Sequence, residues 1–325
     1  MKKQLDVIGH RKYFFGLTLG VFVIGIIFLL VFQLKVDIQF TGGAIVSYSY
    51  SGELNQDEAK KLVEETTGKA VSVTVNENVM IAGSDKTHSS ISFSFSGNNA
   101  LSLENQKAMT AAIEKQFPDN NIQQSEANSV DPTMGKEFFL KCMVAIILAG
   151  LLMVVYVALR FRKIGGWSAG VMALVALVSD VITVFFTFVI FRLPLDSNFI
   201  AVALMILGYS LNDTIVIYDR IRENRRLMGP KVEVGELVNT SINQNLSRTI
   251  NTSLTTFSAV AVVFVVSLIF NLPSVTAFAL PMMIGVISGC YSTNCIAGPL
   301  WVMWQRHKKQ VNDEKNPPKG AKAKA

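Results

Sequence analysis

Charged residues are scarce in this chain of 325 residues, and their scarcity is the first guide to its class. Asp, Glu, Lys and Arg together make up 17% of the sequence, whereas 50% of the residues are hydrophobic. A soluble domain carries about a quarter charged residues, so this composition excludes an ordinary soluble protein. The net charge of +6 does not indicate a nucleic-acid partner, because the basic residues cluster at the ends of apolar runs.

Cysteine is also sparse, and the three cysteines, Cys142, Cys290 and Cys295, lie inside apolar segments. Their odd number and their spacing fit no zinc or redox motif. The nucleotide-binding pattern Gly-x-x-x-x-Gly-Lys-Ser/Thr does not occur in the sequence, so hydrolysis of ATP by this chain is not expected. The sequence therefore predicts a protein that is not an enzyme and that holds neither a cofactor nor a metal.

The chain is rich instead in apolar runs of about 20 residues, the length that crosses a bilayer as a helix. There are six such runs: Phe14 to Leu34, Phe139 to Leu159, Trp167 to Phe191, Phe199 to Ile217, Ile250 to Phe270 and Val275 to Trp304. The last contains Pro281 and Pro299, which favour a kink. The first resembles a signal peptide, but its apolar part is too long and no small-residue cleavage site follows it. We therefore expect this run to remain as an anchor.

Basic residues flank these runs on alternate sides. They precede the first run and follow the second, fourth and sixth, as Lys2, Lys3, Arg11, Lys12, Arg160, Arg162, Lys163, Arg220, Arg222, Arg225, Arg226, Arg306, Lys308 and Lys309. By the positive-inside rule, the chain is a multi-pass protein of the lipid bilayer with both termini in the cytoplasm. Residues 1–34 then form the cytoplasmic N-terminus and first span, and residues 311–325 a disordered basic tail.

This topology places residues 35–137 outside the cytoplasm, in a stretch long enough for one small domain. Period-2 and helical patterns predict strands and helices in the order βαββαβ, at Ala44 to Tyr50, Gln56 to Thr67, Val71 to Ala82, Ser89 to Ser96, Leu101 to Phe117 and Ile122 to Glu126. Asn55 is the expected cap of the first helix. The order is that of a ferredoxin-like α+β domain. A passive spacer stays an alternative, since a fold alone implies no function.

Residues 138–310 hold spans two to six, with a cytoplasmic amphipathic segment at residues 220–247. Within it, Val234, Leu237, Val238 and Ile242 recur at helical spacing. We expect a helix along the membrane surface or against the bundle, with structural support favoured over docking of a partner. The predicted fold class is an all-α membrane bundle of six transmembrane helices with an inserted extracytoplasmic ferredoxin-like α+β domain.

Two acids interrupt the apolar runs, Asp180 in the third and Asp213 in the fourth. A carboxylate at bilayer depth costs about 2.5–3.5 kcal/mol on insertion scales and persists there when it has a partner or a water-filled path. The pair therefore predicts a proton or cation pathway through the bundle. A structural role for Asp180 stays open, as does a structural ion pair between Asp213 and Arg248.

Polar residues lie at helical spacing near these acids. Arg248 and Thr252 share one face of the fifth run with Thr256 alongside, and Asn212 directly precedes Asp213. A stripe of this kind suits a wet pathway, but Thr and Ser also pack between spans without transporting anything. We take Asp213, Arg248 and Asp180 as candidate pathway residues. Asn212, Thr252 and Thr256 are candidate supporting residues.

Several segments along nearly the whole chain can be compared with a known family. They are Phe40-Thr41-Gly42-Gly43, Val130-Asp131-Pro132-Thr133-Met134-Gly135, Ser179-Asp180, Gly208-Tyr209-Ser210-Leu211-Asn212-Asp213, Asp219-Arg220-Ile221-Arg222-Glu223-Asn224 and Ser247-Arg248-Thr249. Together they resemble the SecF branch of the SecD/SecF family of protein-export membrane proteins, in the RND superfamily. Gln39, Asp131 and Leu254 depart from the residues usual in that family and affect the detail of loops, not the assignment.

The resemblance implies a six-span RND-type half that pairs with a SecD-like subunit in the bacterial cytoplasmic membrane. Such a complex is an accessory of the Sec translocon, whose channel is formed by SecY, SecE and SecG. It uses the proton gradient, or sodium in some bacteria, to promote late export of unfolded preproteins. By the same analogy, Arg248 lies near Asp213 and stabilises its ionised form.

Two other classes of protein remain open at this point. One is an RND-type exporter half for lipids or small molecules, although such proteins usually carry two large outer domains or a duplicated twelve-span core. The other is a non-transporting assembly factor that stabilises a partner. Replacing Asp213 with Asn separates these classes, because an assembly factor tolerates the change and an ion-coupled machine does not.

Overall fold

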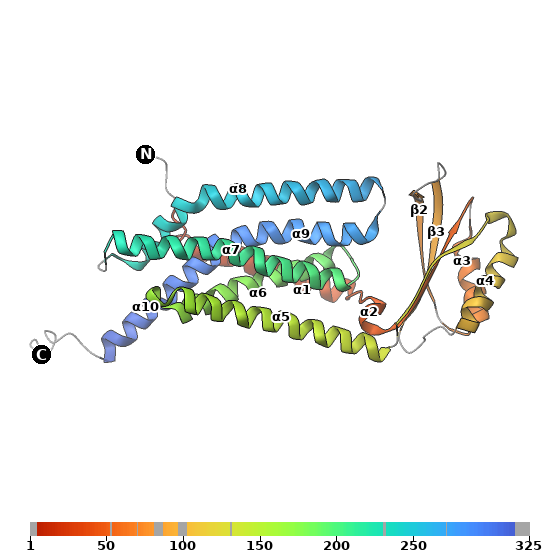
Figure 1. Ribbon diagram of the computed structural model, residues 1–325, viewed down its shortest axis with the longest axis horizontal. Helices are drawn as coiled ribbons and strands as arrows, with labels where there is room; N and C mark the ends of the chain where they lie inside the picture. Colours follow the sequence, from red (N-terminus) through yellow and green to blue (C-terminus); the bar gives the residue numbers. More distant parts are fainter. Residues whose placement is uncertain are drawn as a thin grey trace, which may run out of the picture.

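The structure is a computed structural model of the chain, and it describes residues 5–315 apart from residues 53, 70, 81–86, 97–102, 131, 230, 231 and 271. A bundle of long helices makes up most of the molecule, and a small sheet with two helices stands at one end of it (Figure 1). Each predicted apolar run corresponds, to within about two residues at the ends where it extends beyond the helix, to one of six helical segments in the described chain that are long and apolar enough to cross a membrane. The part of the chain that the structure describes is therefore a mostly helical multi-pass membrane protein.

The bundle consists of seven α-helices in the described chain, because the last apolar segment is divided in two. They are α1 (Arg11–Phe32), α5 (Pro132–Arg160), α6 (Gly166–Ile190), α7 (Ser197–Leu227), α8 (Val234–Ile269), α9 (Pro273–Ser292) and α10 (Gly298–Lys315). A π-helical turn, Thr293–Ala297, joins α9 to α10. The chain bends at this turn, so α10 runs in a different direction from α9 (Figure 1). The last apolar run is therefore kinked, as predicted, and the bend lies shortly before Pro299.

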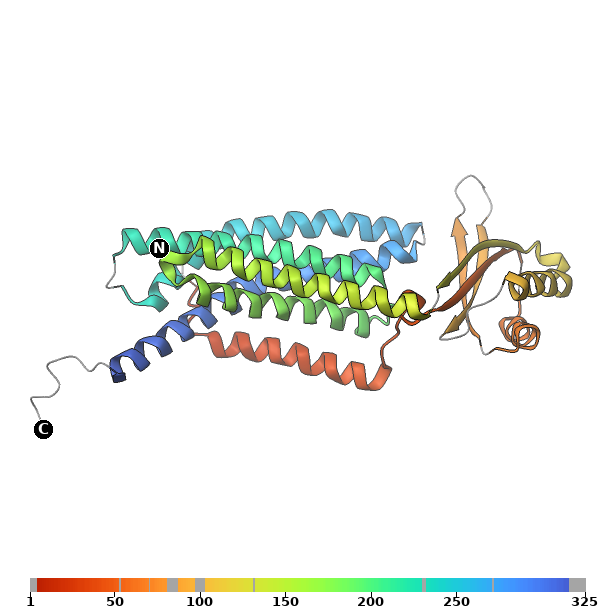
Figure 2. The same ribbon diagram turned by 60° about the horizontal axis from the view of Figure 1, so that its bottom comes forward.

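Burial differs sharply among the helices. In α6 and α7, 50% and 56% of the apolar window is buried, whereas in α1 and α8 the shares are 6% and 11%. Helices α6 and α7 therefore form the centre of the bundle, and α1 and α8 lie at its edge (Figure 2). Exposed Leu, Ile and Val side chains on α1 and α5 are what a lipid-facing surface requires.

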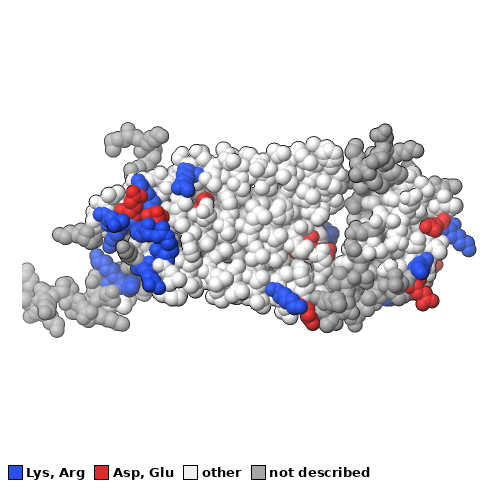
Figure 3. Space-filling model, in the orientation of Figure 1, with Lys and Arg blue, Asp and Glu red and all other residues white. Residues whose placement is uncertain are grey.

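Charge is distributed unevenly over the surface. On the face shown in Figure 3, Lys and Arg gather at the end of the bundle opposite the sheet, and a wide uncharged band separates that end from the sheet domain. At the basic end, Asp219 forms ion pairs with Arg160 and Arg222, at 3.3 and 2.6 Å. The uncharged band has the character of a surface that faces hydrocarbon.

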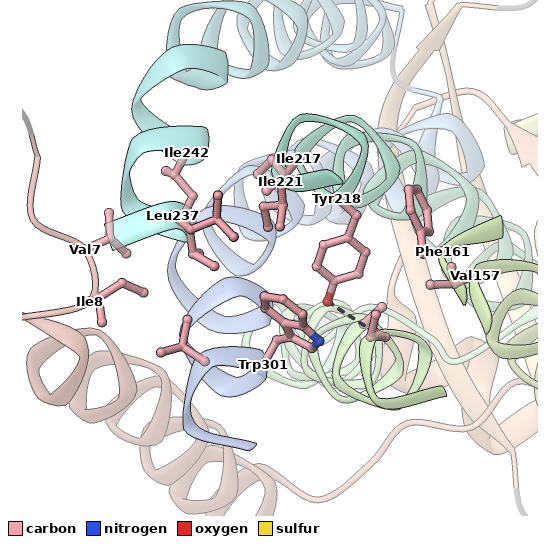
Figure 4. Close-up of a cluster of buried hydrophobic side chains, with 14 residues drawn as sticks. Val7, Ile8, Val157, Phe161, Ile217, Tyr218, Ile221, Leu237, Ile242 and Trp301 are labelled. Carbon is pink, nitrogen blue, oxygen red and sulfur yellow. Dashed lines mark hydrogen bonds between the residues drawn. The ribbon is translucent and has the colours of Figure 1, made fainter. Parts of the chain in front are cut away.

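Large side chains close the basic end of the bundle (Figure 4). Tyr218 is fully buried there, donates its hydroxyl to the Ala169 carbonyl at 3.2 Å, and meets Phe161 edge to face. Leu237 and Ile242, from the start of α8, pack on the same cluster. The amphipathic segment is therefore no separate surface helix: α7 continues to Leu227, and α8 runs without a break from Val234 to Ile269.

The Glu233 carboxylate caps the first turn of α8. It accepts a hydrogen bond from the Glu236 N–H at 3.0 Å and pairs with the Arg306 guanidinium, also at 3.0 Å. Burial alone would raise the pKa of Glu233, but these hydrogen bonds and the positive charge of Arg306 together lower it. The carboxylate ties the start of α8 to α10, which continues through Lys315, five residues into the range predicted as a tail. Residues 316–325 lie outside the described chain.

The small domain at the end of the bundle, which we call the outer domain because it lies beyond the ends of the long helices, has four strands and two helices among its described residues; they follow a short helical turn, α2 (Ile38–Thr41). In chain order they are β1 (Gly43–Tyr50), α3 (Gln56–Thr67), β2 (Ser72–Met80), β3 (Thr87–Ser96), α4 (Leu103–Gln116) and β4 (Gln123–Val130). The sheet order is β2-β3-β1-β4, and each neighbouring pair is antiparallel. Both helices lie on the face of the sheet that is turned away from the bundle (Figures 1 and 2).

Local sequence explains these elements. Alternate β1 residues, Val46, Tyr48 and Tyr50, point into the core under α3 and α4, as a half-buried strand requires. Asn55 caps α3 as predicted, because its side chain accepts from the Asp57 and Glu58 N–H groups. The last strand begins at Gln123 and is longer than the sequence pattern indicates, since it pairs along β1 over most of its length.

The connection between outer domain and bundle is built from two of the motifs noted in the sequence. Gly42 and Gly43 have φ angles of +76° and +138°, which suit glycine, and a Cβ on Gly43 would collide with the Phe95 carbonyl. A Cβ on Gly135, at the start of α5, would lie 2.9 Å from the Gly42 nitrogen. The ring of Phe40 packs against Phe139 of α5. The chain thus enters and leaves the outer domain at a single closely packed junction.

Candidate functional site

Asp180 of α6 lies at the centre of the bundle with its side chain fully buried. Three serine hydroxyls donate to its carboxylate: Ser210 of α7 at 2.7 Å, and Ser288 and Ser292 of α9 at 2.6 Å each. Hydrogen bonds to an ionised acceptor are about twice as strong as neutral ones, so both carboxylate oxygens are well satisfied. Asp180 thereby holds α6, α7 and α9 together.

Asp213 of α7 is in a different situation, although its exposed fraction is only 4%. Its Oδ2 atom is buried and has no hydrogen-bond partner among the residues that the structure describes. Arg248 of α8 lies close enough to act on Asp213 electrostatically, but the two form none of the ion pairs found in the described chain. A buried carboxylate oxygen without a partner is energetically expensive, so the surroundings of Asp213 differ from those of Asp180.

The two acids are close together because Ser210 connects them. Ser210 donates to Asp180 and lies three residues, about one helical turn, before Asp213 on α7. On the other side, the Tyr209 hydroxyl donates to Ser253 of α8 at 3.1 Å. Hydroxyl groups therefore extend from Asp180 across α7 to α8 and pass next to Asp213.

The supporting residues predicted from the sequence are placed less centrally. Asn212 and Arg248 are exposed on the bundle surface, and Thr252 and Thr256 are half-buried. Thr252 donates to the carbonyl of Arg248, four residues earlier, at 2.9 Å. The structure therefore brings Asp180, Asp213 and Arg248 into one region, whereas the Thr252 hydroxyl is engaged within its own helix.

The serine partners of Asp180 were not identified from the sequence. Ser288 and Ser292 are four residues apart and so lie on one face of α9, which was the only available signal. That signal is weak, because serine is common between packed membrane helices. The buried polar residues Thr249 and Asn294 were missed for the same reason.

One more acid lies at the outer end of the bundle, outside the spans. Asp196 caps α7 and accepts from the backbone and side-chain nitrogens of Asn198, at 2.9 and 2.7 Å. Burial raises the pKa of Asp196; the hydrogen bonds from Asn198 oppose the rise and the charge of Asp37 adds to it. The segment after α1 is clipped to this end, because the Asp37 N–H donates to the Leu195 carbonyl at 3.1 Å.

Comparison with known proteins gives consistent relatives. Residues 109–307 match the C-terminal family of the protein export membrane proteins SecD and SecF. The chain is 30% identical over 322 residues to protein translocase subunit SecF of Alicyclobacillus acidocaldarius, covering 98% of this chain and 99% of that protein. It is 32% identical over 305 residues to protein translocase subunit SecDF of Bacillus subtilis, covering 93% of this chain and 38% of that protein.

Two solved structures resemble the chain along most of its length. A crystal structure of SecDF, a translocon-associated membrane protein from Thermus thermophilus, has a TM-score of 0.74 and 26% identity, and covers 94% of this chain and 39% of that one. A super-membrane-facing form of SecDF has a TM-score of 0.66 and 27% identity, with coverage of 97% and 40%. The chain thus spans about two-fifths of its SecDF relatives and nearly all of the SecF relative. These relatives are translocase components, a transport role and not an enzymatic one.

Proposed function

The chain belongs to the SecD/SecF family of protein-export membrane proteins, and from that premise we propose that it couples an ion gradient to late-stage export. It acts as the SecF-type subunit of an accessory complex of the Sec translocon. Protons, or sodium ions, move down their gradient past Asp213, and the movement promotes release of the preprotein on the outer side of the membrane.

The observation that carries this proposal is the unpartnered Oδ2 atom of Asp213, buried within α7. A structural carboxylate in the same bundle has its oxygens occupied, as the three serine bonds to Asp180 illustrate. Asp213 differs because one of its carboxylate oxygens has no partner and can accept a proton or a cation. One elementary charge crossing 100 mV releases about 2.3 kcal/mol, which biases a two-state equilibrium by roughly fiftyfold.

Protonation of Asp213 converts that energy into a movement of helices. The neutral acid no longer attracts Arg248, so α7 and α8 are free to shift relative to one another. The outer end of α7 is clipped to the segment that leads into the outer domain, through the bond between Asp37 and Leu195. A shift of α7 is therefore transmitted to the outer domain through the closely packed junction at Gly42, Gly43 and Gly135. The outer domain then swings and holds the emerging preprotein.

The exposed polar face of α7 and α8 supports a SecD-like partner. Asn212, Arg248, Asn251 and Thr255 are all exposed in the isolated chain, although they lie within apolar spans. Polar groups do not face hydrocarbon without a large cost, so a second protein must cover them. Arg248 then lies at the boundary between the two subunits, next to the proton site. The translocon channel of SecY, SecE and SecG and the unfolded preprotein are the further partners.

The same proposal includes topology and the class of the outer domain. The basic end of the bundle faces the cytoplasm of a bacterial cell, so both termini lie there and residues 35–137 lie outside. The sheet order β2-β3-β1-β4 with antiparallel neighbours, and two helices on one face, supports a ferredoxin-like fold for that domain.

An export assay in cells tests the proposal against the two rival classes. Cells depleted of the chain receive either the wild-type gene or Asp213→Asn, and both precursor processing and the amount of the SecD-like partner are measured. We expect Asp213→Asn to leave the partner at its normal level and to restore no export. Full export with Asp213→Asn would favour an assembly factor. Unchanged preprotein export after complete depletion would favour an exporter of other molecules.

A further inference from the structure

Four buried side-chain atoms lack a hydrogen-bond partner in the part of the chain that the structure describes, and three of them are oxygens. These are Oδ2 of Asp213, Oγ1 of Thr249 and Oδ1 of Asn294, and the residues are 4%, 1% and 4% exposed. Buried polar atoms in folded proteins are almost always paired, with protein groups, water or an ion. Three buried oxygens without a partner in one bundle, called the orphan oxygens below, therefore need a common explanation.

Helical register places the three oxygens at one level of the bundle. One turn nearer the outer side, Tyr209 of α7 bonds Ser253 of α8, and Cys290 of α9 lies within hydrogen-bonding reach of Ser253. Helices α7 and α9 run toward the basic end and α8 runs away from it. A step of four residues in that direction leads from Tyr209 to Asp213, from Ser253 to Thr249 and from Cys290 to Asn294.

Independent contacts agree with this register. On α7 and the π-helical turn, the hydroxyls of Thr214 and Thr293 lie 3.2 Å apart. Their sequence neighbours are Asp213 and Asn294, so these two residues also lie at one level. The three helices α7, α8 and α9 all pack against one another, and Cys290 is close enough to Asp213 to feel its charge.

Thr249 differs from five other threonines of the bundle. Thr183, Thr187, Thr214, Thr252 and Thr255 each donate a hydroxyl hydrogen bond to the carbonyl four residues earlier. A buried threonine in a membrane helix normally satisfies its hydroxyl in this way. The Thr249 hydroxyl makes no such bond, although Thr249 is among the most buried of the six. It is left available to a group outside its own helix.

Asn294 belongs to the π-helical turn Thr293–Ala297. Its amide nitrogen donates to the Cys290 carbonyl at 2.7 Å, which fixes the orientation of the amide and leaves the oxygen unpaired. Turns of this kind are frequent at functional sites, because the widened helix re-aims its side chains. The amide oxygen is thus held in place as an acceptor.

A carboxylate, an amide oxygen and a hydroxyl form an all-oxygen set with one negative charge. Hard cations prefer oxygen ligands of these types, and a protonated carboxyl donates a hydrogen bond to the same acceptors. The other titratable groups around Asp213 are Arg248 from α8, Cys290 from α9 and Asp180 from α6. Asp180 is occupied by its serines and Arg248 is exposed, and neither forms a hydrogen bond with any of the three orphan oxygens.

We propose that Asp213, Thr249 and Asn294 together form the binding site for one small monovalent cation, either a proton that Asp213 takes up and that the other two oxygens help to hold by hydrogen bonding, or sodium. The proposal rests on the proposed function in one respect, since it names the ligands of the ion that Asp213 is to carry. It adds two binding residues, Thr249 and Asn294, and it gives the π-helical turn a role in ion binding.

The test is an infrared titration of the Asp213 carboxyl in the purified complex with its SecD-like partner in lipid nanodiscs. The protonated-acid band is assigned by its loss in Asp213→Asn and is followed against pH, with sodium or with choline as the salt. Thr249→Val and Asn294→Leu each remove one ligand at nearly constant size. Thr187→Val is the matched control, because its hydroxyl is equally buried but bonds within its own helix. Thr249→Ser restores the hydroxyl and guards against a folding defect.

For a proton, sodium has no effect on the wild type, and both ligand variants need about fivefold more protons to reach the titration midpoint, the ratio expected for one lost hydrogen bond. For sodium, the salt shifts the wild-type midpoint, and both ligand variants need about fivefold more sodium for the same shift. Thr187→Val and Thr249→Ser behave as the wild type in either case.

The proposal is overturned if Thr249→Val and Asn294→Leu titrate as the wild type does in both salts. It also falls if Asp213 shows neither a protonation step nor a response to sodium. The titration requires no export, so it is separate from the cell assay. If both ligand variants titrate as the wild type does while Asp213→Asn is inactive in export, these two ligands are excluded and the proposed function stays in place. If both ligand variants shift the titration while Asp213→Asn supports full export, the binding site is kept and the proposed function is excluded.

Discussion

The two membrane acids are expected to respond oppositely to the same change, Asp to Asn. Asp180 accepts three hydroxyl hydrogen bonds at 2.6–2.7 Å, whereas Oδ2 of Asp213 accepts none. Asn keeps the size of the side chain and one acceptor oxygen, but it removes the negative charge and turns the other oxygen into a donor. The substitution should therefore weaken the Asp180 cluster and relieve the unpaired charge at Asp213.

The size of the effect follows from the number of bonds. A hydrogen bond to a charged group contributes about 1.5–3 kcal/mol and a neutral one about 0.5–1.5 kcal/mol. Three bonds that each lose about 1 kcal/mol give about 3 kcal/mol, reduced by the freedom of the Ser288 hydroxyl to turn and accept from the new amide. We expect Asp180→Asn to destabilise the complex by about 2–3 kcal/mol, and Asp213→Asn to change its stability by less than about 0.5 kcal/mol.

The assay is thermal unfolding of the purified complex in mild detergent, followed by tryptophan fluorescence, with Trp301 as a buried reporter at the basic end. Asp219→Asn serves as a control, because Asp219 is a half-exposed acid whose ion pairs lie at the surface. If Asp213→Asn proves as destabilising as Asp180→Asn, Asp213 has a structural partner in the complex and the contrast drawn between the two acids is wrong.

Three further results are expected. In a background without the native cysteines, Asn121→Cys should react with an impermeant thiol reagent from outside and Arg226→Cys only from the cytoplasmic side; the reverse pattern would invert the topology. The chain alone should unfold at a lower temperature than its complex with a SecD-like partner, because Arg248 and its polar neighbours are exposed; equal stability would argue against partner coverage. The lowered pKa of Glu233 means that its contribution to stability is present above the unfolded pKa of about 4.3 and is lost as pH falls through the folded value. Thermal unfolding of Glu233→Gln should therefore depend less on pH in this acidic range than unfolding of the wild type, and an unchanged dependence would assign the effect to another acid.

Features set by local sequence were predicted well. The six apolar runs correspond to the six apolar helical segments, and the limits of α3 were predicted to the residue because Asn55 caps its start and Gly68 ends it with a φ of +65°. The alternation of β1 is likewise local, since Tyr48 and Tyr50 differ from the serines beside them in polarity as well as in burial. Composition, caps and periodicity are properties of short windows, so they can be read without the fold.

Features that depend on packing between helices were not predictable in the same way. The serines around Asp180 come from α7 and α9, about 30 and 110 residues away in sequence, and nothing local distinguishes them from serines that only fill space. Thr252 shows the opposite case, because it lies on the expected polar stripe but bonds within its own helix. The unbroken course of α8 was also missed, since its polar first turns and apolar later turns suggest two separate segments.

The central claim, that an ion gradient drives export through Asp213, is tested most directly by the release of a stalled late-stage preprotein from inverted membrane vesicles. ATP is held constant while the gradient is imposed or collapsed, and vesicles with wild-type chain are compared with vesicles carrying Asp213→Asn at the same level. The wild type should release the preprotein faster when the gradient is present, and Asp213→Asn should lose that increment while keeping the ATP-driven rate. Retention of the full increment by Asp213→Asn would contradict the claim and would place the ion pathway elsewhere.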